Sequence, residues 1–155
     1  MRKRLLPILI LACVLLSVAE LPVRAASMIC FTGANDTLLP LTEDTMPAYY
    51  GTTLYVPGSV FQYLGLYTGF ETSQGRYYVY KGLRRLDFFI QRGTVSDADG
   101  VEYKNVPAHT VNDSIYLPLD LLCEYFGMTY AVISVPANLP LSVLRIKSAD
   151  AVFND

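Results

Sequence analysis

The sequence predicts an α+β fold of two related units, each an antiparallel β-sheet with one short helix packed on it, around a shared core. The main observation is a stretch that occurs twice, as LYVP at 54–57 and as IYLP at 115–118. Each copy is rich in β-forming residues and ends at a proline, whose missing N–H needs no partner in the first turn of a helix. A glycine follows each apolar run, at Gly65 and Gly127, where it suits the left-handed cap of a helix. The repeat therefore predicts a strand followed by a short helix, twice.

Residues 1–25 predict a signal peptide. Basic residues at the N-terminus precede an apolar run from Leu5 to Ala19. The run is shorter than the roughly 20 residues that cross a bilayer as a helix, and Ala25 suits a signal peptidase cleavage site. We expect cleavage after Ala25 and a secreted or cell-envelope location. Two alternatives stay open: a lipid anchor at Cys13 and retention of the segment as a membrane anchor.

Removal of residues 1–25 leaves 130 residues with 8 Lys and Arg against 13 Asp and Glu, so the net charge becomes −5. An acidic chain lacks the basic footprint that nucleic acid or an anionic membrane surface requires. This length fits one domain. We expect that domain over 26–148, with repeat units at about 28–80 and 86–147, a tail at 149–155, and no transmembrane segment after cleavage.

The first unit is expected to open with a β-hairpin, because an apolar run at 28–32 is followed by turn residues and a second strand-like run at 37–41. Pro47 disfavours helix at the residue before it, so this segment should lead extended into the first repeated stretch. The helix at 58–64 is only about two turns long and needs packing onto a sheet. The remaining elements of this unit are strands at 66–71 and 76–80 around a turn at 73–75.

The second unit starts with a strand in which Leu86, Phe88 and Ile90 alternate with more polar positions. This is the period of a half-buried strand whose polar face sees water. Asp99-Gly100 between two strand-like runs is a strong hairpin signal. The second repeated stretch and its helix follow, and closing strands are expected at 130–135 and 141–147.

The order of these elements resembles the copper amine oxidase N-terminal-like domain of secreted bacterial proteins. The resemblance covers 29–147 and is clearest over 112–130, with the hairpin, the x-Pro segment, the [Leu/Ile]-Tyr-[Val/Leu]-Pro strand, and the short helix closed by glycine. The first copy departs from the pattern, because 57–65 is one residue shorter than 118–127 and Gly58 stands where a larger residue is usual. The resemblance implies a non-catalytic module displayed outside the membrane. It implies no copper, since the metal and quinone of the oxidases belong to another domain.

The chain shows no catalytic, cofactor or metal-ligating constellation. His109 is the only histidine, whereas copper and zinc sites take several His or Cys ligands, so we expect an ordinary strand or loop residue. Ser114, His109 and Asp113 come from one loop without a nucleophile elbow. The acidic residues around Asp99 lack the length and the terminal glutamate of an EF-hand loop, and they suit a hairpin tip.

Two cysteines follow the signal segment, Cys30 and Cys123. An exported protein could oxidise them to a disulfide, provided that their Cα atoms lie within about 7 Å of each other. Both could equally be small buried hydrophobic residues. The sequence leaves the two readings open.

All 12 tyrosines follow residue 25. Tyr49-Tyr50 and Tyr77-Tyr78 each place one ring on either face of a strand, so these four residues form the candidate interaction surface. We expect a secreted or cell-surface non-catalytic structural or interaction module with an unknown protein partner. The alternative is a module that binds cell-wall glycan or peptide through exposed tyrosines. Three or more coplanar rings on one open face would favour the alternative, and scattered or buried rings the first reading.

Overall fold

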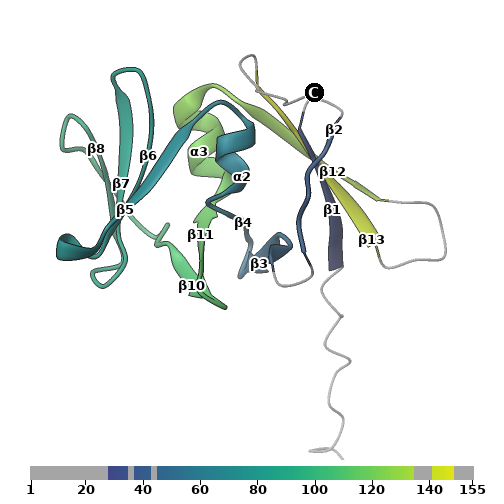
Figure 1. The fold of residues 1–155 in the computed structure, drawn as a ribbon, viewed down its shortest axis with the longest axis horizontal. Helices are drawn as coiled ribbons and strands as arrows, with labels where there is room; N and C mark the ends of the chain where they lie inside the picture. Colours follow the sequence, from purple (N-terminus) through teal and green to yellow (C-terminus); the bar gives the residue numbers. More distant parts are fainter. Residues whose placement is uncertain (1–27, 35–36, 43–44, 135–140, 149–155) are drawn as a thin grey trace, which may run out of the picture.

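The structure, a computed structural model, describes residues 28–34, 37–42, 45–134 and 141–148. These residues form three mostly antiparallel β-sheets and two α-helices, so the predicted α+β class is confirmed. In Figure 1 the helices lie near the centre, with a five-stranded sheet on one side and a four-stranded sheet on the other. The predicted signal peptide and the tail at 149–155 lie outside the described residues.

Both copies of the repeated stretch lie in one central sheet. Its order is β10-β11-β4-β3, and its strands are β3 (Ala48–Tyr50), β4 (Thr53–Pro57), β10 (His109–Val111) and β11 (Ser114–Pro118). Strands β4 and β11 pair antiparallel, with Tyr116 opposite Pro57 and Leu117 opposite Val56. Val56 and Leu117 are fully buried, so the two repeated stretches meet in the core of the molecule.

A helix follows each of these two strands, as predicted. Helix α2 (Val60–Tyr63) has only 4 residues, shorter than the predicted two turns, and α3 (Leu119–Phe126) has 8. Gly127 has a left-handed backbone (φ 71°) and its N–H bonds the Cys123 carbonyl, which confirms the predicted cap of the second helix. Helix α3 packs on β11 and also on β4, the strand of the other copy.

The five-stranded sheet has the order β5-β6-β7-β8-β9. Its strands are β5 (Tyr67–Glu71), β6 (Arg76–Lys81), β7 (Arg84–Phe89), β8 (Thr94–Asp97) and β9 (Glu102–Tyr103). The hairpin predicted at Asp99-Gly100 is confirmed, because β8 pairs antiparallel with β9. One Asp97 carboxylate oxygen accepts the backbone N–H groups of Asp99 and Val101 at 3.0 and 2.8 Å, so this acidic cluster stabilises a turn.

Strand β7 corrects one expectation. Leu86 and Phe88 are fully buried as predicted, but Asp87, on the face expected to see water, is only 8% exposed. Its carboxylate lies 2.8 Å from a guanidinium nitrogen of Arg85 and 3.6 Å from one of Arg76. The burial is tolerated because two cations compensate the charge.

The third sheet has the order β12-β13-β1-β2. Its strands are β1 (Met28–Ala34), β2 (Thr37–Leu38), β12 (Thr129–Ser134) and β13 (Leu141–Lys147). The predicted first hairpin and the predicted closing strand pair are confirmed. Strand β1 runs parallel to β13, and the Ser148 hydroxyl donates to the Leu64 carbonyl at 3.1 Å. This last contact ties the end of β13 to the first helix.

The sheets do not follow the predicted units at 28–80 and 86–147. The first half contributes β5 and β6 to a sheet that β7 to β9 complete, and it contributes β1 and β2 to the sheet that β12 and β13 complete. Helix α2 packs on β4 and β5, both from the first unit, whereas α3 packs on β4 as well as on β11 and β12 and therefore contacts both units. The physical reason is size: a one-turn helix and a two-stranded hairpin bury too little apolar surface to be stable alone.

Candidate binding site

A groove of about 510 Å³ lies where the central and five-stranded sheets meet. The end of β4 forms its floor, the inner face of β5 and β6 forms one wall, and the β10–β11 hairpin forms the opposite lip. Its lining residues are Pro57, Gly58, Ser59, Phe70, Tyr77, Ile90, Thr110, Asp113, Ser114 and Ile115. Segments from both halves of the chain thus build one concave surface.

Gly58 lets the aromatic wall approach the floor. A Cβ atom at this position would lie 2.3 Å from the Tyr77 hydroxyl oxygen and 2.7 Å from the adjacent ring carbon, so any side chain here would force the Tyr77 ring to shift. The Gly58 N–H donates to the Ile115 carbonyl at 2.7 Å, so the floor is also tied to β11. The small residue at 58, which departs from the family pattern, is therefore a steric requirement of the groove.

The Tyr77 ring is held in place by polar contacts. Burial raises its pKa, and a hydrogen bond with Thr68 partly offsets this rise. The Thr68 hydroxyl in turn accepts a hydrogen bond from the Gln62 side chain at 2.7 Å. These two hydrogen bonds link β6 to β5 and α2. Tyr77 therefore presents a fixed, neutral phenol to the groove.

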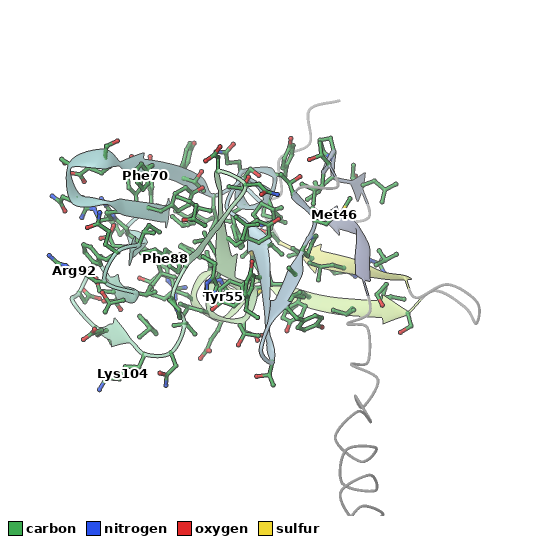
Figure 2. All side chains as sticks on the ribbon, turned by 90° about the horizontal axis from the view of Figure 1, so that it is seen from below. Met46, Tyr55, Phe70, Phe88, Arg92 and Lys104 are labelled. Atoms are coloured by element: carbon green, nitrogen blue, oxygen red, sulfur yellow. The ribbon has the colours of Figure 1, made fainter. Side chains whose placement is uncertain are left out.

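Phe70 forms the solvent-exposed part of the same wall. It lies directly across from Tyr77 in the β5–β6 ladder, but half of its surface is in contact with solvent (50%). In the stick view Phe70 lies near the margin of the molecule, whereas Phe88 of the same sheet lies in the interior (Figure 2). An exposed phenyl ring at the mouth of an apolar groove is available to a ligand.

The opposite lip comes from a tight hairpin turn. Val111 pairs with Ser114, and the two residues between them, Asn112 and Asp113, both have positive φ (46° and 61°). A two-residue turn of this kind matches the twist of the flanking strands, and Asn and Asp tolerate it. Asp113 is the only acidic or basic residue among those that line the groove. The groove is therefore apolar inside with a single carboxylate at its rim.

The four tyrosines predicted as an interaction surface lie at different places. Tyr77 lines the groove, and Tyr78 lies on the opposite face of the same sheet with the Arg85 guanidinium 4.6 Å from its ring centroid. Tyr49 is exposed, and Tyr50 stacks on His109 at 4.2 Å. Neighbouring rings take opposite faces of their strands, as the strand period requires, but the structure does not bring the four together.

Sequence reasoning missed Tyr67 and Tyr80, which form the most exposed tyrosine pair of the described residues. Tyr67 is 64% exposed, and its ring stacks on that of Tyr80 with centroids 5.2 Å apart. The Tyr80 ring is tilted by 40° relative to that of Tyr78. The stacked rings of Tyr67 and Tyr80 turn their faces toward each other. The row of Tyr67, Tyr80 and Tyr78 is therefore not a coplanar platform. The β5–β6 register, in which Tyr67 lies opposite Tyr80, is the signal that would have revealed the pair.

His109 is a strand residue in β10, as predicted. Its ring stacks on that of Tyr50 and lies edge to face against that of Tyr55, with ring centroids 4.8 Å apart in the second pair. In the described ranges no three His, Cys, Asp or Glu side chains gather closely enough to hold a metal ion.

Cys123 is a free, buried thiol in α3, and burial raises its pKa to about 12. A thiol with such a pKa stays protonated at neutral pH and is a poor nucleophile. Because Cys123 is a free thiol, the structure has no disulfide at this residue, and Cys123 is a small buried residue as the second reading expected. The side chain of Cys30 lies outside the described residues.

No family model, curated protein or solved structure matches the chain. The resemblance to the copper amine oxidase N-terminal-like domain therefore stays a prediction from the sequence. Among the residues that the structure describes, no helix is long and apolar enough to cross a membrane.

Proposed function

We propose that the protein is a secreted or cell-surface non-catalytic interaction module that holds a partner in the groove between the central and five-stranded sheets. The observation that carries the proposal is Phe70, which is half exposed at the mouth of the groove and lies beside the fixed ring of Tyr77. Leaving an aromatic ring in water forfeits its burial energy, and a partner that covers it recovers that energy.

The chemistry of the lining defines the kind of ligand. Ile90, Ile115 and Pro57 supply apolar contact, while Ser59 and Asp113 supply polar groups at the rim. An aromatic or aliphatic side chain fits this interior, and a cationic or hydrogen-bonding group beside it complements the carboxylate. An anionic ligand would meet the charge of Asp113 without a cation among the lining residues. We therefore favour a protein partner with an apolar anchor residue.

Within the described residues no set of catalytic groups comes together, and this supports the non-catalytic part of the proposal. The groove lining offers one carboxylate and hydroxyl groups, and the one histidine of the chain stacks on Tyr50. General acid–base or nucleophilic catalysis needs a base within hydrogen-bonding reach of the reacting group.

Binding of cell-wall glycan or peptide through exposed tyrosines is the second candidate. Its support is the row formed by Tyr67, Tyr80 and Tyr78. Because Tyr67 stacks on Tyr80, less ring surface is open for a sugar to stack on. The row therefore supports this candidate less well than the groove supports the first.

We also propose that β3, β4 and α2 form one unit and β10, β11 and α3 a second, related unit, as in the copper amine oxidase N-terminal-like domains that the sequence resembles, while the two outer sheets combine strands of both halves. The pairs Ala48–Tyr55 and His109–Tyr116 are equivalent at an offset of 61 residues. The same offset relates the pair Tyr55–Pro118 to the pair Pro57–Tyr116. These pairings support a local two-fold relation through Val56 and Leu117.

Binding to cell-envelope fractions tests the function. We expect immobilised residues 26–155 to retain a protein component, and Phe70→Ala to lose it. Tyr67→Ala is the matched control, because it removes an exposed aromatic ring from the same strand outside the groove. Retention of polysaccharide that depends on Tyr67 and not on Phe70 would favour the glycan candidate. Export itself is tested by mass spectrometry of the secreted protein, which should begin at Ala26.

A further inference from the structure

We propose that β12 is a dimerisation strand, and that two copies of this chain pair antiparallel within Thr129–Ser134. The proposal starts from the six edge strands of the three sheets. Strands β2 and β9 have 2 residues each, and β3 and β10 have 3 each. Such short edges offer little backbone to another chain.

Strand β5, with 5 residues, is longer, but it contains Gly69 and ends at Glu71, which pairs with Arg76. Strand β12 has 6 residues, TYAVIS, without charge, proline or glycine. Edge strands of natural proteins are normally protected by charge, by proline or by shortness. In the described part of the chain, β12 is the edge strand without any of these protections.

The exposure of β12 shows that its outer side is available. It pairs with β13 at all six positions on one side, and no strand of the described residues pairs with the other side. All of its residues except Tyr130 are exposed, including the apolar Val132 and Ile133. The strand is therefore held extended by β13, while its outer backbone N–H and C=O groups have no partner among the described strands.

The sequence of β12 favours a second copy as the partner. Antiparallel pairing about a two-fold axis normal to the sheet places a residue near the axis opposite itself in the other copy. A charged strand would then oppose its own charge, which is destabilising. In β12 the pairing places Ala131 or Val132 at the axis, and the adjacent pairs are Tyr130 with Val132 or Ala131 with Ile133. All of these pairs are uncharged, and β-branched and aromatic cross-strand pairs stabilise a ladder.

The resulting dimer has one continuous eight-stranded sheet, because each copy contributes a sheet of four strands that ends at β12. A six-residue strand spans about 20 Å, so the interface is small. We therefore expect a concentration-dependent dimer with a dissociation constant on the order of micromolar or weaker.

The test is the mass of the species in solution, measured by analytical ultracentrifugation of residues 26–155 from micromolar to millimolar concentration. We expect dimer to accumulate with concentration, and Ala131→Glu to keep the chain monomeric at least tenfold higher in concentration. With Ala131 at the axis this substitution places the two carboxylates directly opposite each other, and with Val132 at the axis it places them diagonally across the axis on the same face of the sheet. It lies opposite Arg145 on β13, so it preserves the monomer fold.

Val101→Glu is the matched control, since it adds the same charge at an exposed apolar position outside this sheet. It should dimerise like the unmodified chain. Hydrogen exchange provides a second readout: the alternate β12 amides that face away from β13 should gain protection as concentration rises, and those bonded to β13 should stay protected throughout.

Three results would overturn the proposal. These are a monomer at every concentration, a dimer that Ala131→Glu leaves intact, and protection of the outward β12 amides without any change in mass. The last result would mean that a segment of the same chain covers β12.

Discussion

At position 58 the absence of a side chain decides where Tyr77 lies. The ring occupies the volume that a Cβ atom would need, and Thr68 holds its hydroxyl. From the sequence alone Gly58 was only a departure from a family pattern. The contact joins residues 19 positions apart, Gly58 directly after β4 and Tyr77 on β6, so single-strand patterns could not predict it.

Gly58→Ala should therefore destabilise the protein by about 1–3 kcal/mol, the usual cost of overpacking. Gly58 does not have a positive φ, so the effect is steric. The measurement is urea unfolding of Gly58→Ala alone and in a Tyr77→Leu background, where we expect a smaller cost. Equal costs in both backgrounds would refute the proposed contact.

Asp87 shows a second limit of residue patterns. Alternation along β7 correctly predicted the burial of Leu86 and Phe88, but it treated the strand alone and therefore placed Asp87 in water. The compensating charges come from Arg85 on the same strand and Arg76 on β6. Arg76 also bonds Glu71, and this hydrogen bond is the main cause that lowers the pKa of Glu71.

Tyr130 couples the start of α3 to β12. Its hydroxyl donates to the Asp120 carboxylate at 2.6 Å, and this bond is the main cause that raises the pKa of Tyr130. The unfolded chain ionises this tyrosine near pH 10, and the folded chain ionises it only at higher pH. The stabilisation is thus fully present below about pH 10 and is lost as the pH rises toward the folded pKa.

Tyr130→Phe should therefore lower the melting temperature at pH 8 and flatten its fall between about pH 9 and pH 11. Thermal unfolding followed by circular dichroism across this range measures both effects. Tyr63→Phe is the control, because Tyr63 is an exposed tyrosine at the end of α2 and is not among the groups that shift the pKa of Tyr130. If the melting temperatures of Tyr130→Phe and of the unmodified chain fell equally as the pH rose, the hydrogen bond to Asp120 would have no role in this pH dependence.

At the scale of elements, the repeated tetrapeptides, the Asp99-Gly100 hairpin and the cap at Gly127 were predictable because each depends on residues close in sequence. The length of α2 was not. Its run at 58–64 resembles the run that forms α3, but its helix closes after Tyr63, and the Leu66 N–H bonds the Phe61 carbonyl. Packing of Phe61 and Leu64 in the core allows the shorter turn.

Helix α3 gives the element-scale prediction. Leu122 is fully buried between α3 and the central sheet, whereas Phe89 is partly exposed beside Arg92. We expect Leu122→Ala to lower the free energy of unfolding by about 2–5 kcal/mol, and Phe89→Ala to lower it by less. Chemical denaturation of both variants checks which one is less stable. Equal denaturation midpoints with equal m-values would contradict the assignment of Leu122 to the buried face and of Phe89 to the exposed face.

At the scale of the whole molecule, the repeat predicted the elements but not how they combine into sheets. Local pattern fixes each hairpin, while the partner of a hairpin edge depends on contacts distant in sequence. The pairing of β1 with β13 joins residues more than 100 positions apart, and no sequence feature of either strand specifies it. The groove is predictable only in part for the same reason, because its floor, wall and lip come from three separate segments.

This interlocked arrangement predicts how the chain responds to a cut between its halves. Gly82 and Leu83 form the exposed turn between β6 and β7, so a protease site inserted there should leave the fold intact. After cleavage, the halves should stay together as one species in size-exclusion chromatography, because β6 pairs with β7 over six positions and β1 pairs with β13. Each half isolated in denaturant and refolded alone should lack dispersed amide resonances, and mixing should restore them. Halves that separate after cleavage and remain folded would show that the sheets are not shared in solution.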